Sequence, residues 1–237
     1  MSEGTARDRA EQLLLARISE AAGRARLGRR RAVHRAPLTA SEGRAAAVRR
    51  GAYRLLRAGG RQGATAGARL DFYEHGVTAA VEGRIHVVRF DTTAVRRRRV
   101  LSPQGIARVL VLVDVDGERV VLRCGEFAHP EVWGPELRRA VTAAQVPRAL
   151  AALAQGTRLT FGSLWITEDE VGSRGTSLRW PQVEQIEILN GAVAIRVAGR
   201  WQVLGSVASR IPNPFVFHAL AQHLAGLPPR GAERADG

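Results

Sequence analysis

The stretch RLDFYEHGVTAAVEGRIHVVRF, which runs from Arg69 to Phe90, occurs a second time in altered form later in the chain. The second version is RLTFGSLWITEDEVGSRGTSLRW, from Arg158 to Trp180. A period of about 80 residues is too long for a solenoid and suits a duplicated domain. The sequence therefore predicts two related units in one chain.

Two pairs of aromatic residues fix this alignment. Placing Phe72 on Phe161 gives four identities over the first ten positions. Phe90 then falls close to Trp180, because the two aromatic residues lie 18 positions apart in the first copy and 19 in the second. A single gap keeps the register, and we expect Phe90 and Trp180 to occupy equivalent core positions.

Each copy is predicted to form antiparallel strands followed by a helix. Alternating apolar residues predict strands over 69–73, 77–81, 85–90, 108–115 and 119–125 in the first copy. Asp116-Gly117 predicts a two-residue type I′ turn. The first helix is expected to start at Pro135, to restart at Pro147 and to end at Gly156, and the second follows Pro212-Asn213-Pro214.

The basic charge gathers before the repeats. All 36 cationic side chains are arginine, and residues 1–67 carry a net charge of +10. Apolar spacing predicts helices over residues 5–27 and from Thr39 to Gly59, followed by a Gly/Ala linker. Such an arm either packs on the body or a second chain, or it binds a polyanion. If it binds a polyanion, removal of residues 1–60 should leave the body folded.

The fold class that follows is α+β. The expected domains are a basic helical arm and linker (1–67), a first unit (68–156), a second unit (157–227) and a disordered tail (228–237). Each unit is expected to be a bent antiparallel sheet that its own C-terminal helix covers.

Several phrases resemble an actinobacterial family of uncharacterised proteins with bacterial pleckstrin-homology-like domains. They are Tyr73-Glu74-His75-Gly76-Val77, Phe161-Gly162, Leu178-Arg179-Trp180 and Ile211-Pro212-Asn213. The resemblance covers residues 68–225 and implies a tandem repeat of two pleckstrin-homology-like units. It brings no known activity, since fold alone does not define function.

The motifs of common enzymes and cofactor sites are missing from the sequence. A P-loop needs lysine, and the chain contains none. No HExxH, paired-cysteine or Gly-x-Ser-x-Gly motif is present either. The run from Asp114 to Glu118 lacks the distal ligands of a calcium loop and is predicted to be a hairpin turn. Asp71, Glu74 and His75 are expected to be structural. We therefore predict a non-enzymatic protein without metal or cofactor.

One basic run lies within the body of the protein, from Arg96 to Arg99. In a strand, two of these four arginines would face the core, so we expect an exposed, inserted loop. The first unit also holds about thirteen extra residues in this interval by comparison with the second. The candidate ligand-binding residues, for a polyanion or an acidic partner, are Arg96, Arg97, Arg98, Arg99, Arg29, Arg30, Arg31, Arg50, Arg54 and Arg57.

The predicted function is recognition of a protein partner or of a second copy of the chain. Two alternatives stay open: peripheral binding to an anionic membrane surface through the arm and the Arg96–Arg99 loop, and nucleic-acid binding by the arm. The single cysteine, Cys124, is expected to lie in the core and permits no internal disulfide, which favours the cytoplasm. No transmembrane segment is expected, because prolines and polar residues interrupt the longest uncharged run.

Overall fold

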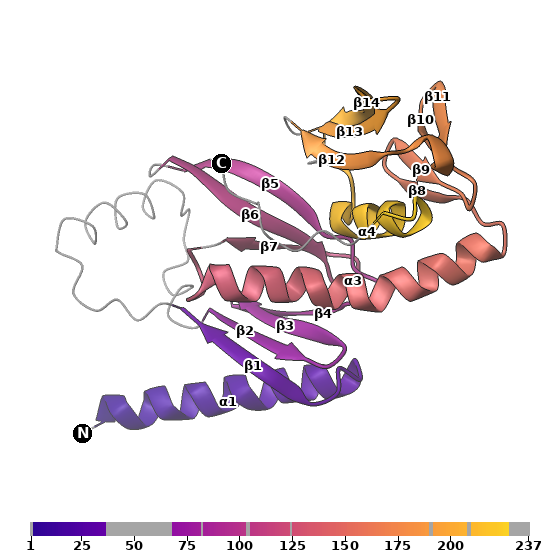
Figure 1. The fold of residues 1–237 in the computed structure, drawn as a ribbon. Helices are drawn as coiled ribbons and strands as arrows, with labels where there is room; N and C mark the ends of the chain where they lie inside the picture. The colour runs from indigo at the N-terminus through magenta and orange to yellow at the C-terminus, as the bar shows by residue number, and fades with distance from the viewer. Residues whose placement is uncertain are drawn as a thin grey trace.

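The computed structural model describes residues 2–36, 68–81, 83–102, 105–123, 125–189, 192–207 and 210–227. It is a mixed α+β fold with an N-terminal helix, four small antiparallel sheets and two further helices (Figure 1). The expected α+β class is therefore confirmed at this level. The predicted second helix of the arm, the linker to Gly67, Cys124 and the tail from residue 228 lie outside the described residues.

The first half of the chain contains a helix, two sheets and a second helix. A four-stranded sheet has the order β1-β2-β3-β4, and a three-stranded sheet has the order β5-β6-β7. All neighbouring strands are antiparallel. The elements are α1 (Ser2–Arg24), β1 (Arg30–Arg35), β2 (Arg69–Tyr73), β3 (Gly76–Val81), β4 (Arg84–Arg89), β5 (Arg96–Ser102), β6 (Gly105–Val113), β7 (Arg119–Arg123) and α3 (Pro130–Ala154).

The second half follows the same order of sheets and closing helix, with shorter strands in its first sheet. A four-stranded antiparallel sheet is followed by a short 3-10 helix, a three-stranded antiparallel sheet and a helix. The elements are β8 (Leu159–Phe161), β9 (Leu164–Ile166), β10 (Glu170–Ser173), β11 (Thr176–Arg179), η1 (Trp180–Gln182), β12 (Gln185–Leu189), β13 (Ala192–Val197), β14 (Arg200–Val207) and α4 (Pro214–Leu224).

One continuous apolar core runs through both halves. In the first half it contains Leu112, Leu122 and Trp133, and in the second it contains Ile195 and Phe217. The helices α3 and α4 pack against each other where the halves meet (Figure 1). Because buried residues of both halves belong to the same cluster, the two halves share one core and are not separate domains joined by a linker.

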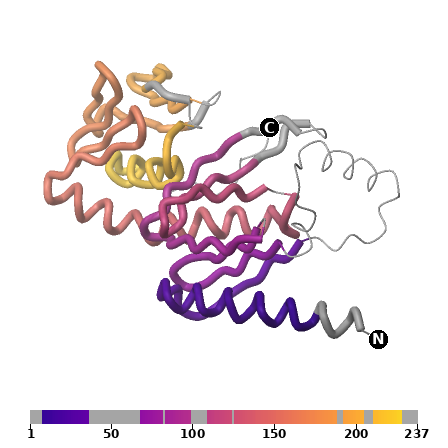
Figure 2. The backbone as a smooth tube through the Cα atoms, turned by 180° about the vertical axis from the view of Figure 1, so that it is seen from behind, coloured from indigo at the N-terminus to yellow at the C-terminus, as the bar shows by residue number. Residues whose placement is uncertain are grey.

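Helix α1 covers the outer face of the sheet β1–β4. In both views this sheet lies between α1 and α3 (Figures 1 and 2). Ala22 of α1 and Leu27, just beyond its end, pack against Tyr73 and Val87. This cover explains why every residue of β2 is buried, since neither face of that strand meets solvent.

Strand β1, the first of the sheet, was not predicted from the sequence. The segment after the first helix was expected to belong to a helical arm, whereas Arg30–Arg35 pairs with β2. The turn between β2 and β3 holds the α1–β1 link in place, because His75 donates its N–H to the Leu27 carbonyl and Glu74 donates to that of Arg29. Residues 2–36 are thus part of the packed structure.

The alignment behind the predicted repeat agrees with the structure at one aromatic pair and disagrees with it at the other. Phe90 and Trp180 each follow the last strand of a four-stranded sheet, and both are buried. Phe72, however, lies in β2 and Phe161 lies in β8, which is the first strand of its sheet. Four short strands of the second half occupy the length that three strands occupy in the first, so the identities at the two phenylalanines are not topologically equivalent.

Two local predictions need correction. Helix α3 begins at Pro130 and runs without a break through Pro135 and Pro147. The β6–β7 hairpin is present, but it is not a type I′ turn: the Asp114 carbonyl accepts from the Gly117 N–H, and Gly117 has a positive φ of 82° while Asp116 does not. The turn is therefore a hairpin loop of more than two residues, in which Gly117 adopts the left-handed conformation.

Candidate functional site

The run from Arg96 to Arg99 belongs to β5 and is not an inserted loop. Its backbone pairs with β6, where Arg97 lies opposite Leu110 and Arg98 lies opposite Val109. Arg97 and Arg98 are nevertheless exposed, and Arg96 is half-buried. The expected exposure of the run is thus correct for these two residues, while the side chain of Arg99 is outside the described residues.

The strand register gathers further arginines on the outer face of this sheet. Arg98 lies opposite Val109, and Val109 lies opposite Arg123 of β7. The Cα atoms of Arg98 and Arg123 are therefore about 10 Å apart, which is the width of two strand spacings. Arg96 and Arg119 belong to the same face by alternation. Arg119 and Arg123 were not predicted as site residues, because only the register of the three strands β5, β6 and β7 brings them to this face.

The arginines proposed in the N-terminal arm are placed differently. The Arg29 side chain lies 3.5 Å from a Glu74 carboxylate oxygen, and the Arg30 guanidinium lies 3.5 Å from Asp71. Arg31 lines a groove described below. Two of the three thus contact acids of the body, and Arg50, Arg54 and Arg57 lie outside the described residues.

A groove of about 760 Å³ lies between α3 and the end of the first sheet. Its walls carry both charges, and several of these charges already pair with each other. Asp91 accepts from Arg89 through both carboxylate oxygens and from Arg148 of α3. The lining residues are Arg31, Phe72, Tyr73, Glu74, His75, Arg89, Phe90, Asp91, Glu136, Arg139, Ala140, Ala143, Ala144 and Arg148.

The Asp91 carboxylate should make stability depend on pH. Its hydrogen bonds from Arg89, and then those from Arg148, lower the pKa of Asp91 below its ordinary value of 3.8. The unfolded chain therefore binds the proton more readily, so this contribution is complete above pH 3.8 and is lost as the pH falls through the lower folded pKa. In acid titrations followed by circular dichroism, we expect Asp91→Asn to unfold with a weaker dependence on pH below 3.8. An unchanged slope would contradict this assignment.

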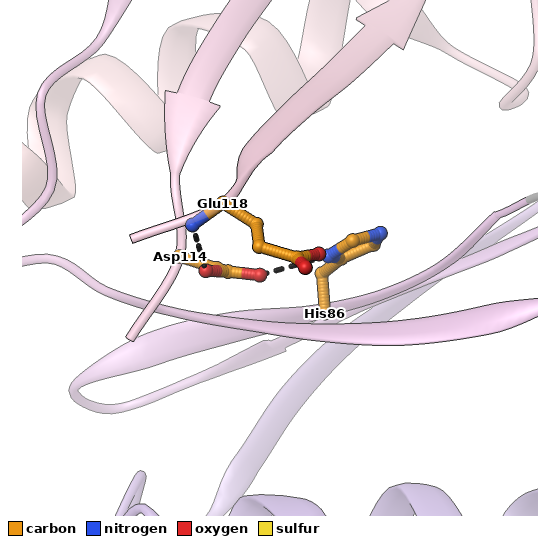
Figure 3. Close-up of side chains that lie close together, drawn as sticks. All are labelled: His86, Asp114 and Glu118. Carbon is orange, nitrogen blue, oxygen red and sulfur yellow. Dashed lines mark hydrogen bonds and ion pairs between the residues drawn. The ribbon is translucent and has the colours of Figure 1, made fainter. Parts of the chain in front are cut away.

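His86, Asp114 and Glu118 bring one imidazole and two carboxylates together (Figure 3). One possible ligand atom from each lies within 4.8 Å of the others, which would suit a divalent cation. The sequence analysis interpreted Asp114–Glu118 as a hairpin turn and did not connect it with His86. The proximity arises because the hairpin docks on β4, where Val115 donates to the Val87 carbonyl.

The hydrogen bonds of this cluster favour a structural clamp. The Asp114 Oδ1 atom accepts from the backbone N–H groups of Asp116 and Glu118, and Oδ2 lies 2.8 Å from His86 Nδ1. Glu118 forms an ion pair with Arg84 at 2.8 Å. Both carboxylates thus have protein partners, and the arrangement ties the turn to β4.

Asp71 and Glu74 are also explained by structural contacts. Asp71 is fully buried and accepts two hydrogen bonds from Arg69, at 2.7 and 2.9 Å. Glu74 accepts from the Arg29 N–H, which holds the pKa of Glu74 below its ordinary value. Gly28, with φ of 81°, lies directly against the Glu74 side chain. The structural role expected for these two acids therefore agrees with their contacts.

The second half presents an apolar pair that the sequence analysis did not single out. Trp201 and Val203 of β14 are 42% and 70% exposed. They are two residues apart in one strand, so their side chains leave the same face of the sheet. Leu204, on the other face, is buried. In the sequence, Trp201 and Val203 are marked only by their spacing, since two apolar residues stand two positions apart in one strand.

The chain belongs to a family of unknown function (DUF6585), whose model matches residues 65–226. This span agrees closely with the residues 68–225 of the resemblance noted above. It begins just before β2 and leaves out α1 and β1, although β1 completes the first sheet. No curated protein and no solved structure matches the chain.

No helix in the part of the chain that the structure describes is both long and apolar enough to cross a membrane.

Proposed function

We propose that the chain is a tandem of two pleckstrin-homology-like units that act as a non-enzymatic binding or scaffold protein. The order of elements supports this proposal, because each half contains a four-stranded sheet, a three-stranded sheet and a closing helix. Sheets of this kind enclose a core of side chains, and a helix covers one end. Their strand edges and outer faces stay accessible to partners.

The starts of the two closing helices also support duplication. His129 precedes α3 and Asn213 precedes α4, and both adopt the left-handed conformation, with φ of 58° and 47°. Each is followed by a proline at the first helical position. A positive φ is uncommon for residues other than glycine, so its occurrence at the same place in both halves favours a common origin.

The observation that carries the function is the exposed pair Trp201 and Val203. Tryptophan is enriched at the energetic centres of protein interfaces, and an apolar centre with a polar rim is typical of them. Arg196 of β13 lies opposite Trp201, and its guanidinium lies 3.4 Å from Glu184. The face of β13 and β14 thus combines exposed apolar groups with a polar border, which suits a protein partner or a second copy of the chain.

Site-specific crosslinking tests this function. A photoreactive amino acid in place of Val203, in the full chain within its native cells, is expected to give a discrete crosslinked product. A product of twice the mass identifies a second copy, and any other single mass identifies a different protein. The same amino acid in place of Val132, which is 50% exposed on α3, serves as the matched control.

The substitutions Trp201→Ser and Val203→Ser should reduce a crosslink formed from Arg196, the exposed residue that lies opposite Trp201 on the same face of the sheet. The stability of the Val203→Ser variant should stay within about half a kcal/mol of the parent, because that side chain is 70% exposed. A crosslinking yield at position 203 no higher than at position 132 would refute the proposal that this face binds a protein.

A further inference from the structure

Strand β5 forms an edge of its sheet. Within the described part of the chain it pairs with β6 alone, so alternate N–H and C=O groups along its other side have no strand partner. Its first residue follows Val95, which is hydrogen-bonded to Asn213. From Arg97 onward no described strand lies beside this edge.

The edge carries arginine on both faces of the sheet. Arg98 shares a face with Val109, while Arg97 shares the opposite face with Leu110. In most strands of this protein one face packs on the core, yet Arg97 and Arg98 are both exposed. The positive charge therefore surrounds the edge and is not confined to one surface of the sheet.

In the part of the chain that the structure describes, Arg97 and Arg98 have no acidic partner. Among the described residues, no carboxylate forms an ion pair with Arg97 or Arg98, whereas Arg84, Arg89 and Arg148 each contact one. Arg119, exposed on the next strand but one, adds to the same positive region. Guanidinium groups bind carboxylates through two parallel hydrogen bonds, which gives strong and directional pairing.

We propose that β5 binds an acidic, extended segment of a partner protein, which pairs with this edge as an added strand. The backbone of the segment would satisfy the free N–H and C=O groups of β5, as in other cases of strand addition. Neighbouring acidic residues of the segment would point to opposite faces, where one meets Arg97 and the next meets Arg98.

The geometry favours this partner over other anions. A flat membrane surface could approach only one face of the sheet and would leave the arginine of the other face unused. Single-stranded nucleic acid is bound by stacking on aromatic side chains, and neither β5, β6 nor β7 contains an aromatic residue. A second copy of β5 would place arginine opposite arginine, which disfavours pairing.

This surface is separate from the Trp201 and Val203 pair, so each proposal can fail without the other. The same arginines should protect the exposed edge from pairing with another copy of the chain, since charged side chains are a common protection of edge strands. An acidic strand is not repelled by these arginines and can still pair with the edge.

The test uses the full chain and two labelled peptides of equal charge, each of six glutamates and two other residues. In the first peptide the two residues are threonine, which favours strands, and in the second they are proline, which cannot donate to a ladder. Fluorescence anisotropy at moderate salt is expected to show binding of the threonine peptide and at least about tenfold weaker binding of the proline peptide. Hydrogen exchange should show protection of β5 amides by the threonine peptide only.

The double variant Arg97→Ser, Arg98→Ser should weaken binding of the threonine peptide by at least about tenfold, with the melting temperature nearly unchanged. The matched control, Arg174→Ser with Arg200→Ser, removes two exposed arginines of the second half and should leave binding within about twofold. Equal affinity for both peptides, or no loss in the Arg97 and Arg98 variant, would overturn strand addition. Binding to phosphatidylserine vesicles but to neither peptide would do the same and would assign the arginines to a lipid surface.

Discussion

A chain that begins at residue 37 is expected to lose the native structure of its first half. Removal of α1 and β1 would expose the outer face of the sheet, where Tyr73 and Val87 are buried, and would leave β2 as an unprotected edge. It would also uncover the Arg69–Asp71 ion pair, which is buried in the intact protein. Circular dichroism and gel filtration of the truncated chain should show unfolding or aggregation.

A milder form of this prediction uses two leucines of the same segment. Leu27 is fully buried beneath the sheet, and its replacement by alanine is expected to cost about 2–5 kcal/mol of unfolding free energy. Leu13 of α1 is 61% exposed, and Leu13→Ala should cost less than about half a kcal/mol. A truncated chain that melts within a few degrees of the full one would show that the segment is dispensable, as the arm hypothesis first implied.

The sequence predicted the strands β2, β3, β4, β6 and β7 and the final helix, because their signals are local. The alternation of Val120 and Leu122 in β7 and the proline before the last helix each specify one element without reference to the rest of the fold. The buried positions of Phe90 and Trp180 were likewise predicted, since aromatic residues that end apolar strands are rarely exposed.

The strand β1 could not be predicted from its own residues. Its sequence, RRAVHR, has two apolar positions among four cationic or imidazole side chains, and its exposed pattern is that of an edge. What makes it a strand is pairing with β2, which begins more than thirty residues later. Long-range pairing of this kind overrides local propensity.

The basic run was misinterpreted for a related reason. Four consecutive arginines exclude a strand only where one face of that strand meets the core. This condition is not met in β5, because Arg97 and Arg98 are solvated on their respective faces at the edge of the sheet. Arg119 and Arg123 join them only through the register of β6 with β7, and no spacing in the sequence encodes that register.

One polar side chain adds hydrogen bonds to the apolar contact between the halves. Asn213 Oδ1 accepts the Val95 N–H at 2.6 Å, and Nδ2 donates to the Thr93 carbonyl and to Gln145 Oε1. Gln145 in turn donates to the carbonyls of Phe90 and Thr93. The residue before α4 thus connects the second half to the β4–β5 loop and to α3.

Replacement of Asn213 by glycine is expected to destabilise the protein by about 2–4 kcal/mol. Glycine keeps the left-handed backbone, with φ of 47°, so the loss reports the side chain alone. The buried Val95 N–H and the Gln145 amide oxygen would then lack partners, and each unsatisfied buried group costs about 1–3 kcal/mol. The same substitution at His129, the equivalent position before α3, is the matched control, because that side chain is exposed and pairs with the exposed Glu131. Urea unfolding should therefore separate the two glycine variants clearly, with Asn213→Gly showing an additional early transition as the second half detaches. Equal stability of the two variants would mean that the shared apolar core, and not Asn213, holds the halves together.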